Sequence, residues 1–206
     1  MSFRKEKKIK LSISERILME GSLIKEGMIQ LFPPRKVCSC YFDTIDFQTF
    51  YDSDEGILPR KKFRIRWYNN DLSFSKEIKI SSIEGRFKTI QKFEDKKFSE
   101  SYEASFIDNQ YGFIYPSIIV TYNRTYYKLD SYRITFDSYI KYLDLRSSFR
   151  RQSLDPENVM EIKTGIEISD DKIESRFCYT NSRFSKYSRG IQFLDKPLKL
   201  SKQFRL

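Results

Sequence analysis

A two-residue alternation of apolar and cationic side chains recurs along this chain and constrains its fold more than any other feature. In segment 59–68 the apolar positions are Phe63, Ile65 and Trp67, and the alternate positions are Arg60, Lys62, Arg64 and Arg66. Successive side chains of a β-strand point to opposite faces, so this segment is predicted to be a strand with one cationic face. Neighbouring cations on that face are about 6.8 Å apart and repel each other by roughly 2.5 kcal/mol at an effective dielectric constant of about 20. Such a stripe needs bound anions or carboxylates close by.

The alternation recurs in other segments, which are therefore predicted to be strands as well. They are residues 3–11, 35–43, 74–80, 86–92, 122–128, 132–137 and 160–163, and a last short apolar stretch covers 191–194. The charged faces hold fourteen cations, namely Arg4, Lys8, Arg60, Lys62, Arg64, Arg66, Lys79, Arg86, Lys88, Arg124, Lys128, Arg133, Lys163 and Lys186, and four carboxylates, namely Glu6, Glu77, Asp137 and Glu161. Fourteen minus four equals the formal net charge of +10, so the positive excess lies on one class of strand face.

An antiparallel sheet that curls with these charged faces inward encloses a cationic tunnel that suits a polyanion. The apolar faces then point outward and need helices to cover them. One helix is predicted from Ser14, as the N-cap, to Gly27, with apolar spacing at Ile17, Leu18, Ile24 and Met28. The absence of an internal repeat indicates a single domain over residues 1–206. The predicted fold is mainly β (α+β): a closed antiparallel β-barrel of about eight strands with a few flanking helices.

The chain contains no histidine, and this excludes several classes of enzyme chemistry. Nucleophiles activated by imidazole and imidazole metal sites are not available. A metal would sit on carboxylate oxygens, which favours Mg²⁺ or Mn²⁺ over zinc. The cysteines Cys38, Cys40 and Cys178 are too few for a disulfide framework or a zinc knuckle, so they are predicted to be free thiols in a reducing compartment.

Neither end of the sequence suggests a membrane or secreted protein. No apolar run approaches the roughly 20 residues that a membrane span needs, and the charged start has no apolar segment behind it. We therefore expect a cytoplasmic protein.

Several other segments have ordinary structural interpretations. The aromatics Tyr41, Phe42, Trp67, Tyr126 and Tyr127 are predicted to pack in the barrel wall rather than stack on a nucleotide. Asp43 is predicted to cap a strand end or a turn. Residues 47–56 are predicted to be a connection, and residues 145–158 a solvated basic loop.

An ordered series of short motifs carries a resemblance to a known family. The motifs are Arg4-x-Glu6-x-Lys8, Tyr41-Phe42-Asp43-Thr44, the stripe from Arg60 to Tyr68, Glu77-Ile78-Lys79, Tyr122-Asn123-Arg124, Arg133-Ile134-Thr135-Phe136-Asp137, Glu161-Ile162-Lys163 and Ser185-Lys186-Tyr187. In these the sequence resembles the catalytic domain of the VTC (vacuolar transporter chaperone) proteins, the polyphosphate polymerase branch of the CYTH-like triphosphate tunnel metalloenzymes. The likeness runs from about Phe3 to Leu194 and leaves a tail of residues 195–206.

This resemblance implies a function and its ligands. Polymerase members transfer the γ-phosphoryl group of ATP onto a polyphosphate chain in a β-barrel tunnel, with Mn²⁺ or Mg²⁺ as cofactor. The resemblance leaves two arrangements open: the chain works alone, or it works beside a separate membrane or regulatory protein. Hydrolytic members open with Glu-x-Glu-x-Lys, whereas this chain has Arg4 at the first position. That departure argues against a simple triphosphatase.

The resemblance also assigns residues to the site. Lys8, Arg64, Arg66, Lys79, Arg124, Arg133 and Lys186 are assigned to the triphosphate or product chain, and Arg4, Arg60, Lys62, Lys88 and Lys163 are further candidates. Glu161 is the predicted metal ligand. Glu6, Glu77 and Asp137 are alternative ligands, or they orient lysines and arginines through ion pairs.

Three alternative functions remain open at the level of sequence. The first is a triphosphatase that acts on inorganic triphosphate, nucleotides or RNA ends. The second is a module that binds RNA or single-stranded DNA through its cationic stripes and interleaved tyrosines. The third is a polyphosphate-binding protein without catalysis.

Overall fold

The computed structural model describes residues 4–69, 71, 73–177 and 182–195. Its strands are β1 (Arg4–Leu11), β2 (Ile29–Asp43), β3 (Arg60–Tyr68), β4 (Phe74–Ser82), β5 (Gly85–Phe93), β6 (Phe106–Asp108), β7 (Gly112–Leu129), β8 (Tyr132–Asp144), β9 (Gln152–Leu154) and β10 (Asn158–Gly165). Its helices are α1 (Ile13–Lys25), α2 (Gln48–Glu55), α3 (Lys96–Ser101), α4 (Asp170–Phe177) and α5 (Lys186–Asp195).

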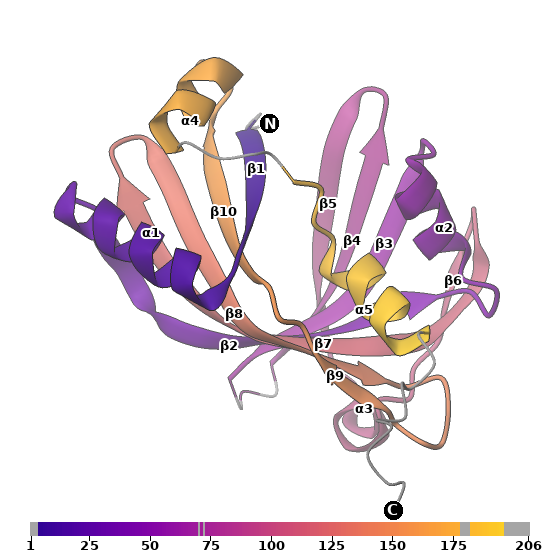
Figure 1. Ribbon diagram of the computed structural model, residues 1–206. Helices are drawn as coiled ribbons and strands as arrows, with labels where there is room; N and C mark the ends of the chain where they lie inside the picture. The colour runs from indigo at the N-terminus through magenta and orange to yellow at the C-terminus, as the bar shows by residue number, and fades with distance from the viewer. Residues whose placement is uncertain (1–3, 70, 72, 178–181, 196–206) are drawn as a thin grey trace, which may run out of the picture.

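One strongly curled antiparallel sheet dominates the structure (Figure 1). Eight strands follow each other in the order β1-β10-β8-β7-β2-β3-β4-β5, while β6 pairs with β7 and β9 with β8. Strands β1, β10 and β8 form a first wall, and strands β3, β4 and β5 form a second wall (Figure 1). The predicted antiparallel tunnel-type sheet of about eight strands is confirmed.

The sheet is a half-barrel rather than the hydrogen-bonded ring that the sequence predicted. Strands β1 and β5 are its two edges, and no ladder joins them within the described residues. The segment before α5 occupies part of the β1 edge instead, since the Ser182 backbone N–H and hydroxyl both donate to the carbonyl oxygen of Lys8, at 3.2 Å. An edge covered by a loop in this way is protected from pairing with other strands.

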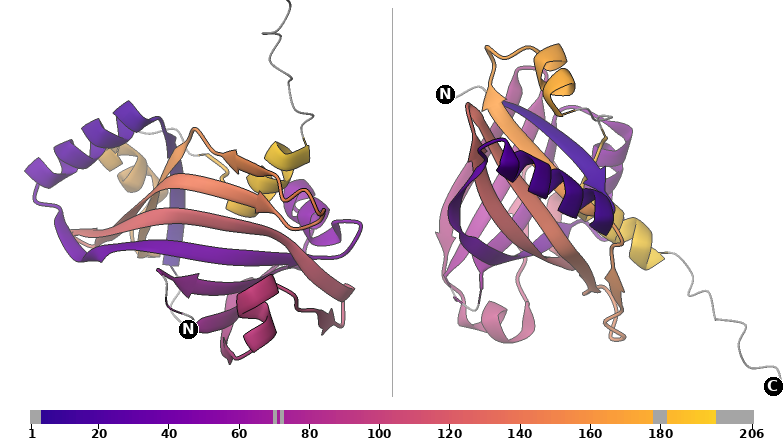
Figure 2. Two further views of the ribbon diagram at one scale, coloured as in Figure 1. Left: turned by 90° about the horizontal axis from the view of Figure 1, so that it is seen from below. Right: turned by 60° about the vertical axis from the view of Figure 1, so that its left-hand side comes forward.

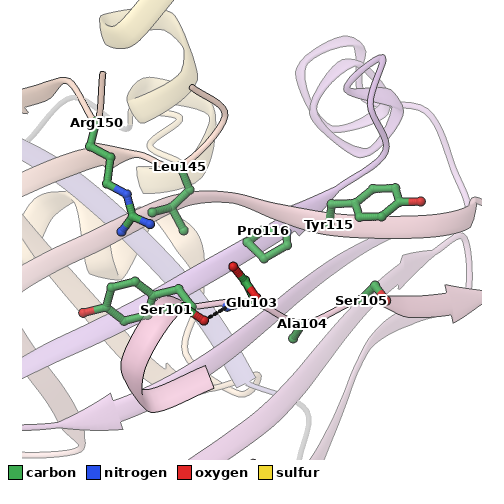
Figure 3. Close-up of a pocket in the computed structure, with 9 residues that line it drawn as sticks. Ser101, Glu103, Ala104, Ser105, Tyr115, Pro116, Leu145 and Arg150 are labelled. Atoms are coloured by element: carbon green, nitrogen blue, oxygen red, sulfur yellow. Dashed lines mark hydrogen bonds between the residues drawn. The ribbon is translucent and has the colours of Figure 1, made fainter. Parts of the chain in front are cut away.

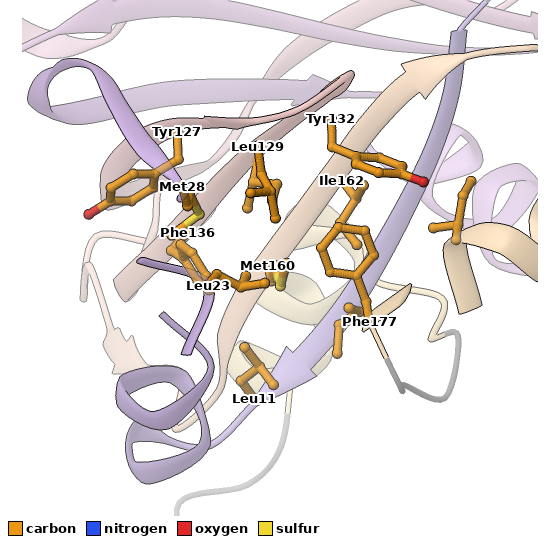
Figure 4. Packing of buried hydrophobic residues seen from close by; sticks show 13 residues of the cluster. Leu11, Leu23, Met28, Tyr127, Leu129, Tyr132, Phe136, Met160, Ile162 and Phe177 are labelled. Atoms are coloured by element: carbon orange, nitrogen blue, oxygen red, sulfur yellow. The ribbon is translucent and has the colours of Figure 1, made fainter. Parts of the chain in front are cut away.

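The convex face of the sheet carries two apolar clusters beneath helices, as the alternation predicted. Over the first wall, Leu23 of α1 and Ile173 and Phe177 of α4 pack on buried strand residues (Figure 4). Figure 2 shows α1 lying across the outside of this wall. Over the second wall, Phe98 of α3 packs with Trp67 and other residues of β2, β3 and β4.

A third apolar cluster lies on the concave face and is covered by α5. Its members include Tyr187, Ile191 and Leu194 of α5, which pack on Val120 of β7 and Tyr142 of β8. Residues 191–194, which the sequence showed only as a last short apolar stretch, belong to helix α5. The spacing of the three α5 residues fits one helix face, and a four-residue apolar stretch is too short to reveal that period.

Two other expectations about helices also need correction. Residues 48–55 form α2, where a connection was predicted, because Asp43 caps this helix: its carboxylate accepts from the backbone N–H groups of Thr49 and Phe50. Asp43 was predicted to cap a strand end or a turn. It is the last residue of β2, and its carboxylate binds the first turn of α2. Helix α1 begins two residues earlier than predicted, because its N-cap is Ser12, which forms a capping box with Glu15, and not Ser14.

Three of the four apolar residues used to predict α1 do not cover the sheet, and the fourth, Met28, follows the helix and is buried in the first cluster. Ile17, Leu18 and Ile24 are exposed, and the helix packs through Leu23 instead. Cys38 and Cys40 are buried free thiols, as predicted, and Cys178 lies outside the described residues. Among the described residues, no helix is long and apolar enough to cross a membrane. The prediction of a single domain stays a prediction.

We expect Phe98→Ala to destabilise the fold by about 3–5 kcal/mol, because it opens a cavity under the second wall. Phe98 is fully buried and its ring contacts those of Phe42, Trp67 and Phe74. Phe149→Ala is the matched control, since Phe149 is 86% exposed. Urea unfolding measures both, and equal unfolding free energies for the two variants would contradict this packing.

Candidate functional site

The charged faces of the strands come together on the concave side of the sheet. In the second wall, the register sets Arg60, Ser81 and Arg86 in one row, Lys62, Lys79 and Lys88 in the next, and Arg64, Glu77 and Ile90 in a third. In the first wall, the rows are Glu6, Lys163, Arg133 and Lys128, then Lys8, Glu161, Thr135 and Tyr126, then Lys10, Val159, Asp137 and Arg124. Four of these six rows contain a carboxylate beside a cation, whereas the row of Lys62, Lys79 and Lys88 contains cations alone.

Glu77 holds the cations of the second wall. Arg64 Nε donates to Glu77 Oε2 at 2.6 Å, Lys88 Nζ donates to Oε1 at 2.8 Å, and Arg66 Nη1 lies 3.9 Å from Oε2. Burial alone would raise the pKa of Glu77, but the charges of Arg64 and Arg66 outweigh it and lower the pKa to about 2. Glu77 is therefore ionised at neutral pH and orients these cations rather than standing free.

Asp137 plays the same part beside α5. Its carboxylate is fully buried and accepts from Arg124 Nε and Nη2 at 2.5 and 2.7 Å and from Lys186 Nζ at 2.5 Å. Burial opposes ionisation of Asp137, yet Arg124 and Lys186 lower its pKa. A bidentate guanidinium fixes geometry as well as charge, so Asp137 aims Arg124 and ties the start of α5 to β8.

Two further carboxylates, Glu161 and Glu6, face each other diagonally across β10 and β1. Lys163 Nζ lies 2.7 Å from Glu161 Oε1 and 3.9 Å from Glu6 Oε2, and Lys8 Nζ lies 3.2 Å from Glu6 Oε1. Although burial acts against ionisation, nearby cations lower the pKa of both carboxyl groups: chiefly Arg124 for Glu161 and Lys8 for Glu6. Two ionised carboxylates thus lie on adjacent strands of the concave face.

Lys62 and Lys79 have no carboxylate within ion-pair distance among the described residues. Lys62 Nζ donates to Ser185 Oγ at 2.9 Å. Burial, together with the charges of Lys8 and Lys79, lowers the pKa of Lys62 to about 8. Burial also lowers the pKa of Lys79, despite the attraction of Glu6. A buried ammonium without a counter-ion is costly, and a bound anion would relieve that cost.

Tyrosine and serine hydroxyls complete the site, and the motifs alone did not assign them a role. Tyr41 was predicted only to pack, and its ring does stack on Tyr187, but its hydroxyl also accepts from Arg64 Nη1 at 3.1 Å. Arg66 donates to Ser39 Oγ at 3.1 Å and to the Tyr122 hydroxyl at 3.3 Å. Burial would raise the pKa of Tyr41, but Arg64 and Arg66 lower it to about 8.

The remaining predicted ligands lie at the margin of this cluster. Arg133 is exposed, in a row with Lys128 and Lys163, and not in contact with the central carboxylates. Arg60 donates to the carbonyl oxygens of Gly56 and Ile57. The Arg4 backbone belongs to β1, and its side chain lies outside the described residues.

The carboxylates present suit a divalent metal only together with a phosphate ligand. No group of three or more acidic or cysteine side chains with metal-binding geometry occurs in the part of the chain that is described. Glu161 and Glu6 are two carboxylates on adjacent strands, and Mg²⁺ sites commonly use one or two carboxylates plus substrate oxygens. Glu77 and Asp137 are each occupied by two or more cations, which favours their alternative role as orienting groups.

A hollow on the outside of the molecule is separate from this cluster (Figure 3). It is lined by Tyr102, Glu103, Tyr115, Leu145 and Arg150, among others. No predicted phosphate ligand lines it. Arg150 of the basic loop therefore faces this outer hollow and not the concave site.

Comparison with known proteins places this arrangement in a family. The model of the VTC domain matches residues 3–195, which is nearly the whole chain. This chain belongs to the VTC domain family. The resemblance found in the short motifs is thereby confirmed. No curated protein matches the sequence at a significant level.

Solved structures share the fold of this VTC domain at low sequence identity. A candidate adenylate cyclase from Bacillus halodurans has 14% identity and a TM-score of 0.59, over 89% of this chain and 94% of that one. The PH1819 protein of Pyrococcus horikoshii has 13% identity and a TM-score of 0.54, over 92% and 97%. A candidate adenylyl cyclase from Hippeastrum, described with a dominant triphosphatase activity, has 14% identity and a TM-score of 0.51, over 96% and 99%.

We expect the affinity for tripolyphosphate to fall by roughly tenfold or more as the pH rises from 7 to 9. Over this range Lys62 loses its positive charge and Tyr41 gains a negative one, since both have a pKa of about 8. A hydrogen bond to a charged group contributes about 1.5–3 kcal/mol. Titration calorimetry on the VTC domain measures the affinity.

The control is the double variant Lys62→Arg with Tyr41→Phe, which titrates at neither position. The ratio of the two affinities cancels the ionisation of tripolyphosphate itself. A ratio that stays constant from pH 7 to 9 would contradict the assignment.

Proposed function

We propose that this VTC domain is a metal-dependent polyphosphate polymerase that transfers the γ-phosphoryl group of ATP to the end of a polyphosphate chain. The observation that supports the proposal is the excess of positive charge, most of it partly buried, on the concave face. Nine cations lie there, namely Lys8, Lys62, Arg64, Arg66, Lys79, Lys88, Arg124, Lys163 and Lys186, against the four carboxylates Glu6, Glu77, Asp137 and Glu161. The surplus of five suits an ion with several negative charges, such as a triphosphate.

The chemistry of phosphoryl transfer fits these residues. In the reaction a terminal oxygen of the acceptor chain attacks the γ-phosphorus of ATP, the bond from that phosphorus to the β–γ bridging oxygen breaks, and ADP leaves. The acceptor oxygen is already anionic, so no protein base is required. Enzymes accelerate such reactions mainly by positioning the reactants and by neutralising charge on the phosphate oxygens. A chain without histidine can do both.

The geometry suggests a division of roles among the cations. Arg64 is held by Glu77, Arg124 by Asp137, and Arg66 by the hydroxyls of Ser39 and Tyr122. Their guanidinium groups are therefore pre-organised for phosphate oxygens. Lys62 and Lys79 form no ion pair with any described carboxylate, so they gain most from a bound anion. Lys8 and Lys186 add charge from β1 and α5.

The cofactor is proposed to be Mn²⁺ or Mg²⁺ held by Glu161, with Glu6 as the second carboxylate. When bound, such an ion neutralises developing charge on the phosphate oxygens. Lys163 Nζ lies within 4 Å of both carboxylates, and the ion would replace Lys163 at one of them. ATP and polyphosphate are the proposed partners.

The runner-up is a triphosphatase, which shares the binding site and differs only in the acceptor. The Hippeastrum protein with triphosphatase activity has the same fold, and this observation supports the alternative. Arg4 in place of the first acidic residue of the hydrolase motif favours the polymerase. A nucleic-acid module is disfavoured, because Tyr122 and Tyr126 beside Arg124 are buried and not available for base stacking.

We expect γ-labelled ATP with Mn²⁺ to yield a ladder of polyphosphate chains on a gel, and Glu161→Gln to lower the rate by 100-fold or more because a ligand of the cation is lost. Glu84→Gln, on the exposed β4–β5 hairpin, is the matched control and should retain full activity.

Other products would select another function. Free phosphate without chains would contradict the polymerase and support the triphosphatase. Polyphosphate binding without turnover would support a binding protein without catalysis. A Glu161→Gln variant as active as the control would refute the metal assignment.

A further inference from the structure

Three consecutive residues at the start of α5 contact three separate groups of the concave site. The carbonyl oxygen of Phe184 accepts from Lys8 Nζ at 3.2 Å, the hydroxyl of Ser185 accepts from Lys62 Nζ, and Lys186 Nζ donates to Asp137. These partners come from β1, β3 and β8. The position of this short segment therefore sets the positions of three lysines at once.

An ion pair one turn further along α5 anchors this segment. Arg189 Nε and Nη2 donate to Asp155 Oδ2 and Oδ1 at 2.8 and 2.6 Å, and the Tyr142 hydroxyl donates to Asp155 Oδ2 at 2.6 Å. The Asp155 carboxylate is fully buried in the loop before β10. The Arg189 guanidinium also lies over the ring of Phe184, 4.9 Å from its centroid. Among the described residues, Asp155 and the Tyr142 hydroxyl make no ion pair or hydrogen bond with the cations of the concave site, whereas the Phe184 ring lies 5.6 Å from Lys186 Nζ.

Gly190 lets α5 approach the sheet closely. A Cβ atom at this position would lie 2.5 Å from Ile118 Cδ1 and 2.7 Å from Tyr142 Cδ1. Ordinary contacts between carbon atoms are about 3.5–4.0 Å, so a methyl group here would push α5 outward by about 1 Å. The ring of Tyr142 is buried and tied to Asp155, so it is not free to move aside.

A second anchor holds the first turn of α5. Tyr187 donates to Asp43 Oδ2, and the same carboxylate caps α2. The helix is thus fixed at two points, while its first residues face the concave site. A surface helix that served only to cover apolar strands would need neither buried carboxylate.

We propose that α5 is a positioning wedge for the phosphate site, and that Gly190, Asp155 and Arg189 are positioning residues for the binding of triphosphate through Lys8, Lys62 and Lys186. This inference rests on the proposed function only in so far as a triphosphate binds on the concave face. It holds equally for transfer to a polyphosphate chain and for hydrolysis. Residues far from a reacting centre can act in this way, because a displacement of about 1 Å can cost roughly 100-fold in rate.

The test compares Gly190→Ala with Gly21→Ala. Both changes add one methyl group to a glycine inside a helix, but a Cβ at Gly21 has no atom within 4 Å. Both variants keep every charge of the chain. Tripolyphosphate is the probe, its affinity is measured by titration calorimetry at pH 7, and thermal unfolding reports whether each variant is folded.

We expect Gly190→Ala to weaken tripolyphosphate binding by tenfold or more at a temperature where the variant is fully folded, and Gly21→Ala to leave it unchanged. The pH dependence gives a second readout that destabilisation alone would not move. With α5 displaced, the Lys62 ammonium becomes hydrated, so the midpoint of the decline in affinity near pH 8 should shift upward. Equal affinity and an equal midpoint in the two variants would overturn the proposal.

Arg189→Lys and Arg189→Gln keep the test decisive if Gly190→Ala does not fold. Lysine retains the charge beside Asp155 and should restore part of the affinity, whereas glutamine should lose tenfold or more. Equal binding by both variants and by the wild type would overturn the inference. Failure of the proposed function is distinct, since it shows as absent chain synthesis while tripolyphosphate still binds to the wild-type protein.

Discussion

Repulsion among like charges on one face of a curled sheet is the constraint on which this structure depends. The cations of the concave face need negative charges nearby, because partial removal from water makes their mutual repulsion stronger. The VTC domain meets this with buried carboxylates, each shared between cations: Glu77 between Arg64 and Lys88, and Asp137 between Arg124 and Lys186. These carboxylates are fewer than the cations, so part of the positive charge is not neutralised by the protein. A polyanion would bind to this remaining charge.

Stability and binding are accordingly divided between the two faces of the sheet. Most of the apolar packing lies on the convex face, beneath α1, α3 and α4. The concave face has one apolar cluster, which lies under α5 and next to the charged residues. Substitutions on the convex face should therefore change the free energy of unfolding more than the affinity for a polyanion. Substitutions of the charged residues on the concave face should change the affinity more than the free energy of unfolding.

The strands and the cationic face could be predicted from the sequence because both depend on a local period of two. Lys62 and Arg64 share a face wherever the strand is placed. The partners of these residues depend on register and on contacts distant in sequence. Lys62 meets Ser185 across 123 positions, and Lys186 meets Asp137 across 49. Helix α5 was missed for the same reason, since its apolar face is recognisable only when Tyr142 and Val120 are known to lie beneath it.

Because the sheet is open between β1 and β5, no backbone ladder in the described part of the chain fixes the distance between its two walls. In a closed ring, backbone hydrogen bonds between the first and last strands would fix the distance between the walls. Here β1 and β5 are not paired, and residues 182–186 contact β1 through Lys8, β3 through Lys62 and β8 through Asp137. The spacing of the proposed phosphate ligands then depends on side-chain contacts and on the position of one helix. Side-chain contacts can relax around bound chains of different length more readily than a backbone ladder can, and this property would suit the proposed polymerase, whose product lengthens at each transfer.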